Sequence, residues 1–179
     1  MNVPRTPVFY AAAVAALAFL FVAFEAVFVA SEPLVDNCVV EAYVVERSSA
    51  GVAARVGPDE SDDAAFFLPT MTTLTIVESR DGWARIGRAT TPDGSTRRSE
   101  NALWIPADAL GVSVAAKDSE RVPLYDAPRP NAVATDSLPA QVEARVIDAR
   151  DAWVKVTRAG VVGWLPPDAH SADPFSPAP

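Results

Sequence analysis

Two short segments of the chain repeat a charge pair followed by an indole. Arg80-Asp81 precedes Trp83, and Arg150-Asp151 precedes Trp153, 70 positions later. An arginine, a carboxylate and an aromatic ring at fixed spacing could recognise a partner. The simpler account is a tight turn between two strands, in which the Asp bonds nearby backbone donors and the Arg stays in solvent. The sequence favours this turn account over a recognition site.

The remaining reactive side chains form no recognisable catalytic pattern. The carboxylate pairs Asp59-Glu60 and Asp62-Asp63 fall in a turn region, which predicts a solvated acidic loop rather than an acid/base pair. One cysteine, Cys38, and one histidine, His170, exclude an intramolecular disulfide framework, a Cys/His metal cluster and a Cys–His dyad. The sequence contains no nucleophile elbow, phosphate loop or metal-ligand spacing. We therefore expect no catalytic residues, no metal site and no cofactor. For Cys38 we expect a buried or unused thiol, and an intermolecular disulfide is the alternative.

The charge balance argues against nucleic acid as a partner. The chain has 15 Lys and Arg against 23 Asp and Glu, which gives a formal net charge of −8. An acidic surface repels phosphate backbones. We therefore expect no nucleic-acid binding.

The N-terminal part of the chain has the composition of a membrane span. Val8–Ala30 is almost wholly apolar and contains one charge, Glu25. This run is longer than a secretory signal needs, and Phe28 fits a cleavage site poorly, so an uncleaved transmembrane helix over residues 8–30 is expected. Arg5 in the stub 1–7 and the acidic residues after the span place the N-terminus in the cytoplasm. The expected location is a bacterial inner membrane, with the rest of the chain in the periplasm; inverted topology remains open.

Inside the span, a few residues could pack against another helix. Ala11 and Ala15, and likewise Ala12 and Ala16, have the small-x-x-x-small spacing that allows close approach of helices. A carboxyl group in a span, here Glu25, indicates function by default, although near the end of the helix it can also reach the interface. Helix packing and a chance pattern both remain open.

The rest of the chain has the pattern of short strands separated by turns. Apolar runs, alternating or continuous, occur in the segments EAYVVERS, TLTIVES, GVSVAA, QVEARVID, WVKVTR and VVGWL. Runs of this length and spacing, without a helical period, indicate small antiparallel barrels.

These strands belong to an internal repeat. Residues 42–87 match residues 112–157 at an offset of 70, whereas LWIPADAL (Leu103–Leu110) matches GWLPPDAH (Gly163–His170) at an offset of 60. The change of offset predicts an extended hairpin loop inserted in the first copy at 88–101, where the sequence is polar and contains Pro-Asp-Gly. The expected organisation is a juxtamembrane segment (31–40), a first barrel (41–111), a second barrel (112–170) and a disordered tail (171–179). The two barrels are expected to be joined stiffly, because no linker separates them.

Both copies resemble the bacterial SH3-like (SH3b) module. The module typically has a strand arginine, a proline soon after it, a strand tryptophan and a closing tryptophan. In copy one these positions hold Arg55, Pro58, Trp83 and Trp104. In copy two they hold Tyr125, Pro128, Trp153 and Gly163-Trp164. Where the family usually has a turn glycine, copy one has Thr70 or Met71 and copy two has Ala140 or Gln141. Copy two also lacks the strand arginine. The resemblance implies two tandem SH3-like barrels of an all-β class behind one transmembrane helix. It also implies a non-catalytic protein, because members of the family are usually targeting modules or scaffolds.

Five residues are candidates for binding a partner. Arg97 and Arg98 lie in the inserted loop of an otherwise acidic protein, while Trp104, Tyr125 and Trp164 could line a shallow groove. Aromatic faces suit sugars or the anchor residues of a protein, but core packing is the simpler account of the tryptophans.

Two functions follow from this organisation. The first is an accessory subunit or scaffold of a larger membrane complex, for which photosynthetic, respiratory and envelope-stress assemblies are all compatible. The second is a cell-envelope module that recognises peptidoglycan. The short juxtamembrane segment and the stiff tandem favour the scaffold, since a wall binder gains from a long linker. Expected partners are the lipid bilayer and other membrane-protein subunits, with peptidoglycan as the alternative.

Overall fold

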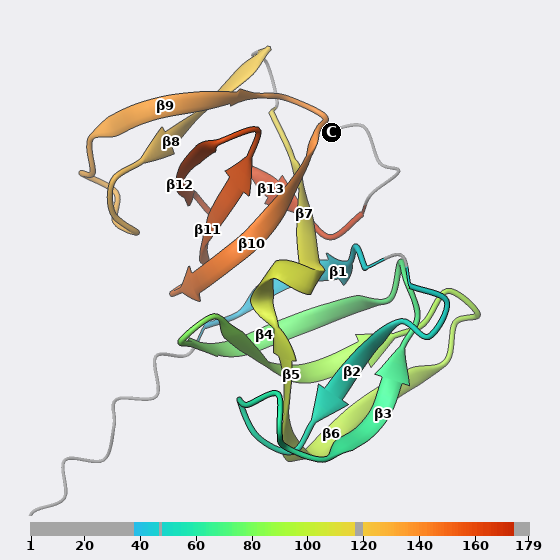
Figure 1. Ribbon diagram of the computed structural model, residues 1–179. Coiled ribbons are helices and arrows are strands. Elements are labelled where there is room, and N and C mark those ends of the chain that lie inside the picture. Colours follow the sequence, from blue (N-terminus) through green and yellow to red (C-terminus); the bar gives the residue numbers. More distant parts are fainter. Residues whose placement is uncertain (1–37, 47, 117–119, 174–179) are drawn as a thin grey trace, which may run out of the picture. The chain divides into compact units, whose positions relative to one another are not determined.

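The described part of the chain is an antiparallel β-structure. The structure, a computed structural model, describes residues 38–46, 48–116 and 120–173, all within one compact unit (Figure 1). Within these ranges no helix is long and apolar enough to cross a membrane. The predicted stub 1–7, the predicted span 8–30 and the packing residues Ala11, Ala12, Ala15, Ala16 and Glu25 lie outside the described residues.

The first half of the sheet has six strands, and the second half repeats them. The first-half strands are β1 (Val40–Val44), β2 (Val52–Arg55), β3 (Ala64–Leu68), β4 (Thr73–Arg80), β5 (Trp83–Thr90) and β6 (Thr96–Pro106). A short 3-10 helix, η1 (Ala107–Ala109), leads into the second half. The second-half strands are β7 (Leu110–Val114), β8 (Arg121–Tyr125), β9 (Ala134–Pro139), β10 (Glu143–Arg150), β11 (Trp153–Arg158), β12 (Val161–Leu165) and β13 (His170–Ser171).

All described strands belong to one continuous sheet. Its order is β3-β2-β6-β5-β4-β1-β7-β10-β11-β12-β8-β9, with β13 paired to β7. The first six strands, β3-β2-β6-β5-β4-β1, correspond to the last six taken in reverse, β9-β8-β12-β11-β10-β7. The two halves of the sheet are therefore equivalent. The all-β prediction is confirmed, and the two repeats form a single antiparallel sheet.

Strand β7 joins the halves. Its first residues pair with β1, as Gly111 with Tyr43, while its other edge pairs with β10 and its last residues pair with β13. In Figure 1, β7 runs from the first half of the sheet into the second. The pairing of β13 with β7 repeats the pairing of β7 with β1, since His170 opposite Val114 corresponds to Leu110 opposite Val44. One strand thus ends the first half and begins the second, which leaves no linker between them.

Two predicted segments can be compared with the structure. The predicted extended hairpin loop 88–101 is a hairpin whose strands reach into the segment: β5 extends to Thr90, β6 begins at Thr96, and Arg88 pairs with Arg98. The hairpin is favoured because Asp93 accepts hydrogen bonds from Thr91 Oγ1 and the Ser95 backbone within the turn. Ser171, the first residue of the predicted tail 171–179, belongs to β13, and residues 174–179 lie outside the described residues.

The apolar core is made from the inward-facing residues of both halves. Its largest fully buried members include Leu68, Ile76, Ile105, Leu124 and Leu165. The juxtamembrane prediction overlaps this core, because Cys38 and Val40 are fully buried in it. The buried-thiol interpretation of Cys38 agrees with this placement.

The turns of the two halves differ at one position, which gives a matched prediction. Asp81-Gly82 and Asp151-Ala152 both have positive φ, as a two-residue hairpin turn of type I′ requires. Ala152, at φ 45°, takes a left-handed conformation that costs a residue with a Cβ about 1 kcal/mol or more. We expect Ala152→Gly to raise the free energy of unfolding by about 1 kcal/mol, and Gly82→Ala to lower it by a similar amount, in urea denaturation. Nothing lies within 4 Å of a Cβ added at Gly82, so only the backbone term changes. Opposite signs for the two changes are required; equal signs would contradict the argument.

Candidate functional site

The closing tryptophans lie on the outer face of the sheet. Trp104 and Trp164 are 6% and 5% exposed, yet neither belongs to the core cluster that contains their neighbours Ile105 and Leu165. Because successive residues of a strand point to opposite faces, the two indoles are buried on the side away from the core. Other outer-face side chains must cover them.

In the first half, a row of side chains crosses four strands on this outer face. Glu78 of β4 pairs with Arg85 of β5, Arg85 pairs with Trp104 of β6, and Trp104 pairs with Arg55 of β2. Arg85 Nε lies 2.7 Å from Glu78 Oε2. We call these four residues the first outer row.

The second half repeats the row with one change of type. Asp148 of β10, Lys155 of β11, Trp164 of β12 and Tyr125 of β8 pair in the same sequence. We call these four residues the second outer row. The position of Arg55 is taken by Tyr125, whose ring meets Trp153 edge-to-face at a centroid distance of 5.6 Å.

The repeated arginines of the two turns cover the indoles of these rows. Arg80 Cζ lies 5.2 Å from the Trp104 ring centroid, and Arg150 Cζ lies 6.0 Å from that of Trp164. A guanidinium at this distance from an indole makes a cation–π contact. Both arginines are exposed to solvent, as predicted, and the predicted turn is present; the contact with the indole is an addition to that prediction. The repeated Arg and Trp form a packing unit that both halves share.

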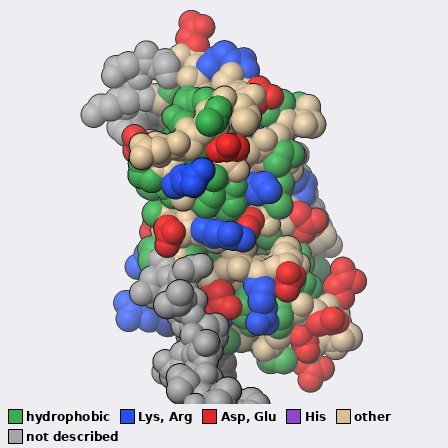
Figure 2. Space-filling model, turned by 90° about the vertical axis from the view of Figure 1, so that its left-hand side faces the viewer, with side chains coloured by type: hydrophobic (Ala, Val, Ile, Leu, Met, Phe, Trp, Pro, Cys, Tyr) green, Lys and Arg blue, Asp and Glu red, His purple; other side chains and the backbone are tan. Residues whose placement is uncertain are grey.

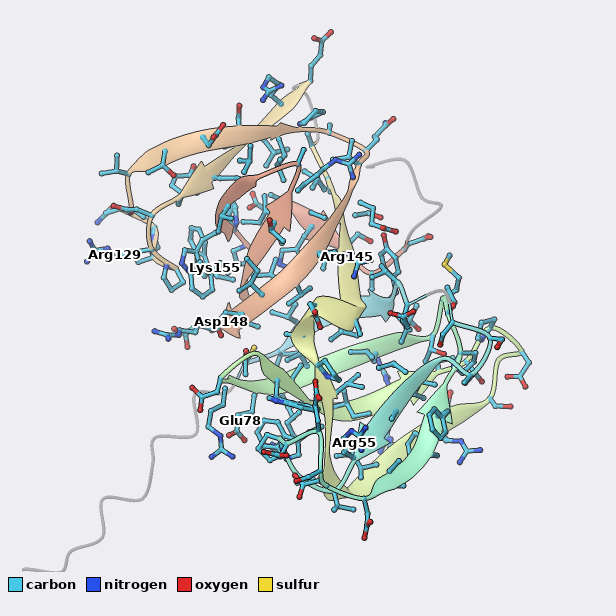
Figure 3. All side chains as sticks on the ribbon, in the orientation of Figure 1. Arg55, Glu78, Arg129, Arg145, Asp148 and Lys155 are labelled. Carbon is cyan, nitrogen blue, oxygen red and sulfur yellow. The ribbon has the colours of Figure 1, made fainter. Side chains whose placement is uncertain are left out.

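Parts of the two outer rows lie on one side of the view in Figure 3. Lys155 and Asp148 lie at the left of the second half and Glu78 at the left of the first half, while Arg55 lies nearer the middle. Figure 2 shows this side, where basic and acidic side chains alternate with apolar ones. The surface is thus mixed in charge, in contrast to the net charge of −8 for the whole chain.

A groove of about 370 Å³ opens in the first half beside its row. Its walls include Phe67 of β3, Trp83 of β5 and Pro106 of β6, with Arg55 at one side. Phe67 is 56% exposed and Trp83 is half-buried. In the second half the counterpart of Trp83 is Trp153, which is 8% exposed and packed against Tyr125.

The five predicted partner-binding residues fall in three places. Tyr125 and Trp164 are a cross-strand pair of the second outer row, and Trp104 belongs to the first. Arg97 and Arg98 are exposed on the hairpin extension of β6, and Arg97 Cζ lies 5.2 Å from the Phe66 ring centroid. The sequence did not indicate Arg85, Lys155 or Phe67, because their roles depend on which strands pair and in which register.

Hydrogen bonds within the acidic turn lower the pKa of one of its carboxyl groups. Asp59 accepts hydrogen bonds from the Ser61 hydroxyl and backbone, and these hold its pKa below the usual range. A general acid needs a raised pKa instead. Within the described ranges, no cluster of three His, Cys, Asp or Glu is placed to hold a metal ion.

The single histidine gives a pH-dependent prediction. His170 Nε2 lies 3.1 Å from the Ala152 carbonyl oxygen, and burial lowers the pKa of its imidazole. The unfolded chain, with a pKa near 6.5, binds the proton more readily than the folded one. The contribution of His170 to stability is therefore present above about pH 6.5 and is lost as the pH falls below it. We expect the urea midpoint to fall between pH 7.5 and 5.5, and His170→Gln to reduce this slope. An unchanged slope in His170→Gln would assign the pH dependence to other groups.

Comparisons with known proteins do not assign a family. No family model and no curated protein matches the chain. Among solved structures, NlpC2 from Trichomonas vaginalis is similar with a TM-score of 0.31 and 16% identity over 76% of this chain and 49% of that one. NlpC1 from Trichomonas vaginalis is similar with a TM-score of 0.30 and 16% identity over 75% and 46%. The chain spans about half the length of these two proteins.

Proposed function

We propose that the protein is a non-catalytic, single-pass membrane protein whose two halves are SH3-like units acting as a scaffold or accessory subunit of a larger membrane complex. In this proposal, η1 with β7 closes the first unit and the turn before β13 closes the second. The N-terminal span anchors the chain and the sheet lies in the periplasm.

The observation that carries the proposal is the shared strand. Because β7 pairs with β1, β10 and β13, the two halves cannot separate or rotate without breaking the sheet. Two mutually fixed units offer partner subunits a surface of constant geometry, whereas flexibly linked modules suit a search for scattered sites. Tyr43 adds a link, since its hydroxyl donates to Glu143 Oε2 across the junction at 3.2 Å.

The aromatic side chains of the two outer rows support the peptidoglycan alternative less well than the scaffold. Stacking on a sugar needs an accessible ring face, but arginines lie over Trp104 and Trp164 and both indoles are almost fully buried. Tyr125 is engaged with Trp153. The outer rows thus offer little free aromatic surface to a glycan.

The test is extraction of the full-length chain from its native membrane in mild detergent, followed by native gel electrophoresis and mass spectrometry. We expect migration with other membrane subunits. Migration as a free monomer under conditions that preserve known membrane complexes would reject the scaffold. In parallel, sedimentation with purified peptidoglycan should leave the full-length chain in the supernatant, and retention in the pellet would favour the alternative. A periplasm-active reporter fused after residue 179 tests orientation, and an inactive but stable fusion would overturn it.

A further inference from the structure

The two halves differ at the groove of the first half, and this difference suggests a binding site. At the position where Tyr125 fills the space against Trp153, the first half has Arg55. Arg55 Nη1 donates to the Asp62 carbonyl oxygen at 2.6 Å. Phe67 stands where the second half has Ser137, as shown by the equivalent pairings of Ala53 with Phe67 and Pro123 with Ser137. The same fold thus has a groove with aromatic walls in one half and a packed aromatic pair in the other.

The groove has both apolar and acidic lining residues. Phe67, Trp83 and Pro106 are among the apolar ones. Three lining residues are acidic, and we call them the carboxylate rim: Glu46, Glu60 and Asp108. Aromatic rings bordered by carboxylates attract a cation, through both the ring face and the opposite charge.

The two arginines of the groove bond backbone carbonyl groups within the protein and keep their charges, so three acidic lining residues stand against two basic ones. Arg55 bonds the Asp62 carbonyl, and Arg145 Nη1 donates to the Asp108 carbonyl oxygen at 2.8 Å. Arg145 comes from β10 of the second half, so both halves build this groove. The fixed junction at β7 therefore also fixes the shape of the groove.

We propose that the groove binds an extended segment of a partner protein, with a large apolar side chain against Phe67 and Trp83 and a Lys or Arg at the carboxylate rim. This inference rests on the proposed scaffold function and names the chemistry of its partner. Acidic partners are disfavoured by the rim and by the net charge of −8. Large aromatic side chains are frequent among the residues that dominate the binding energy of protein contacts.

The test uses an exchange between the two halves. Full-length protein in mild detergent, as wild type, Arg55→Tyr and Arg129→Tyr, is used to select from a phage-displayed library of random dodecapeptides. Arg55→Tyr introduces against Trp83 the side chain that covers Trp153. Arg129→Tyr is the matched control, because Arg129 is exposed in the second half and is not part of the groove (Figure 3).

We expect wild type and Arg129→Tyr to enrich peptides in which a large apolar residue lies near a Lys or Arg. The affinity of an enriched peptide should fall at least about tenfold in Arg55→Tyr, by loss of the apolar contact area. No enrichment, enrichment of acidic peptides, or equal affinity for Arg55→Tyr would each overturn the inference. If Arg55→Tyr fails to fold, Glu60→Lys serves instead, since Glu60 is exposed and reversal of its charge should weaken the same peptides several-fold. An unchanged peptide affinity in Glu60→Lys would also overturn the inference.

The native gel separates this inference from the function on which it rests. If wild type migrates in a complex and Arg55→Tyr stays in it with unchanged yield, the scaffold holds and the groove is not its contact. If wild type is a free monomer, the scaffold itself fails. Loss of the complex in Arg55→Tyr, but not in Arg129→Tyr, supports both.

Discussion

Gly111→Ala should lower the free energy of unfolding by about 2–3 kcal/mol, although it adds a single methyl group. Gly111 lies in β7 at the point where the strand pairs with both Tyr43 and Arg145. A Cβ at this position would lie 2.4 Å from Val45 Cγ1 and 3.4 Å from the Ala144 carbonyl oxygen. Val45 is 4% exposed, so its side chain has little free space in which to move aside. Urea denaturation at pH 7.5 measures the loss.

Relief of the contact is the control for this prediction. Val45→Ala removes the methyl group that a Cβ at Gly111 would meet. The double variant Gly111→Ala with Val45→Ala should therefore be less destabilised than the sum of the two single changes. Simple additivity would mean that the junction tolerates the methyl group and that the β1–β7 pairing is looser than the structure indicates.

This junction could be predicted only in part from the sequence. The repeat itself was evident, because turn residues and tryptophans recur at fixed offsets, and the lack of a linker before Val112 indicated a stiff tandem. That β7 would serve both halves was not evident, since the apolar pattern GVSVAA is the same for a strand with one paired edge or two. Pairing between distant segments is a property of the folded chain and leaves no local pattern.

The sequence also could not predict on which face of the sheet each tryptophan lies. Trp83 and Ile86 are three residues apart in β5 and therefore point to opposite faces, and Ile86 is the one in the core cluster. Both residues are apolar, so the sequence alone does not say which of the two faces meets the core. The open groove could not be predicted from the sequence either. Arg55 stands where the second half has an aromatic residue, and this difference matters only because the fold places Arg55 near Trp83 and Phe67.

The non-glycine residues at the predicted turn-glycine positions show where local reasoning succeeds. Met71 and Gln141 have φ of 67° and 58°, the left-handed region that glycine occupies without cost. The backbone at both positions is fixed by a hydrogen bond from their own N–H to the Val44 and Val114 carbonyl oxygens. Both turns thus have the left-handed geometry that glycine favours, with these hydrogen bonds holding a less favourable residue in place.

Trp164→Ala should destabilise the protein by about 3–5 kcal/mol, the usual cost of removing a buried large side chain. Trp164 is 5% exposed, pairs with Tyr125 and Lys155, and lies under Arg150, so its loss leaves a cavity on the outer face beneath charged groups. Urea denaturation of this variant is compared with that of Arg150→Gln, which removes only the cation–π contact and should cost about 0.5–1 kcal/mol. A loss below about 1 kcal/mol for Trp164→Ala would show that the indole is an accessible binding face. Because this loss of stability is large, a failure of Trp164→Ala to bind a ligand could reflect unfolding as well as a lost binding contact. Arg55→Tyr and its control Arg129→Tyr test binding directly, at a groove that the chain does not fill itself.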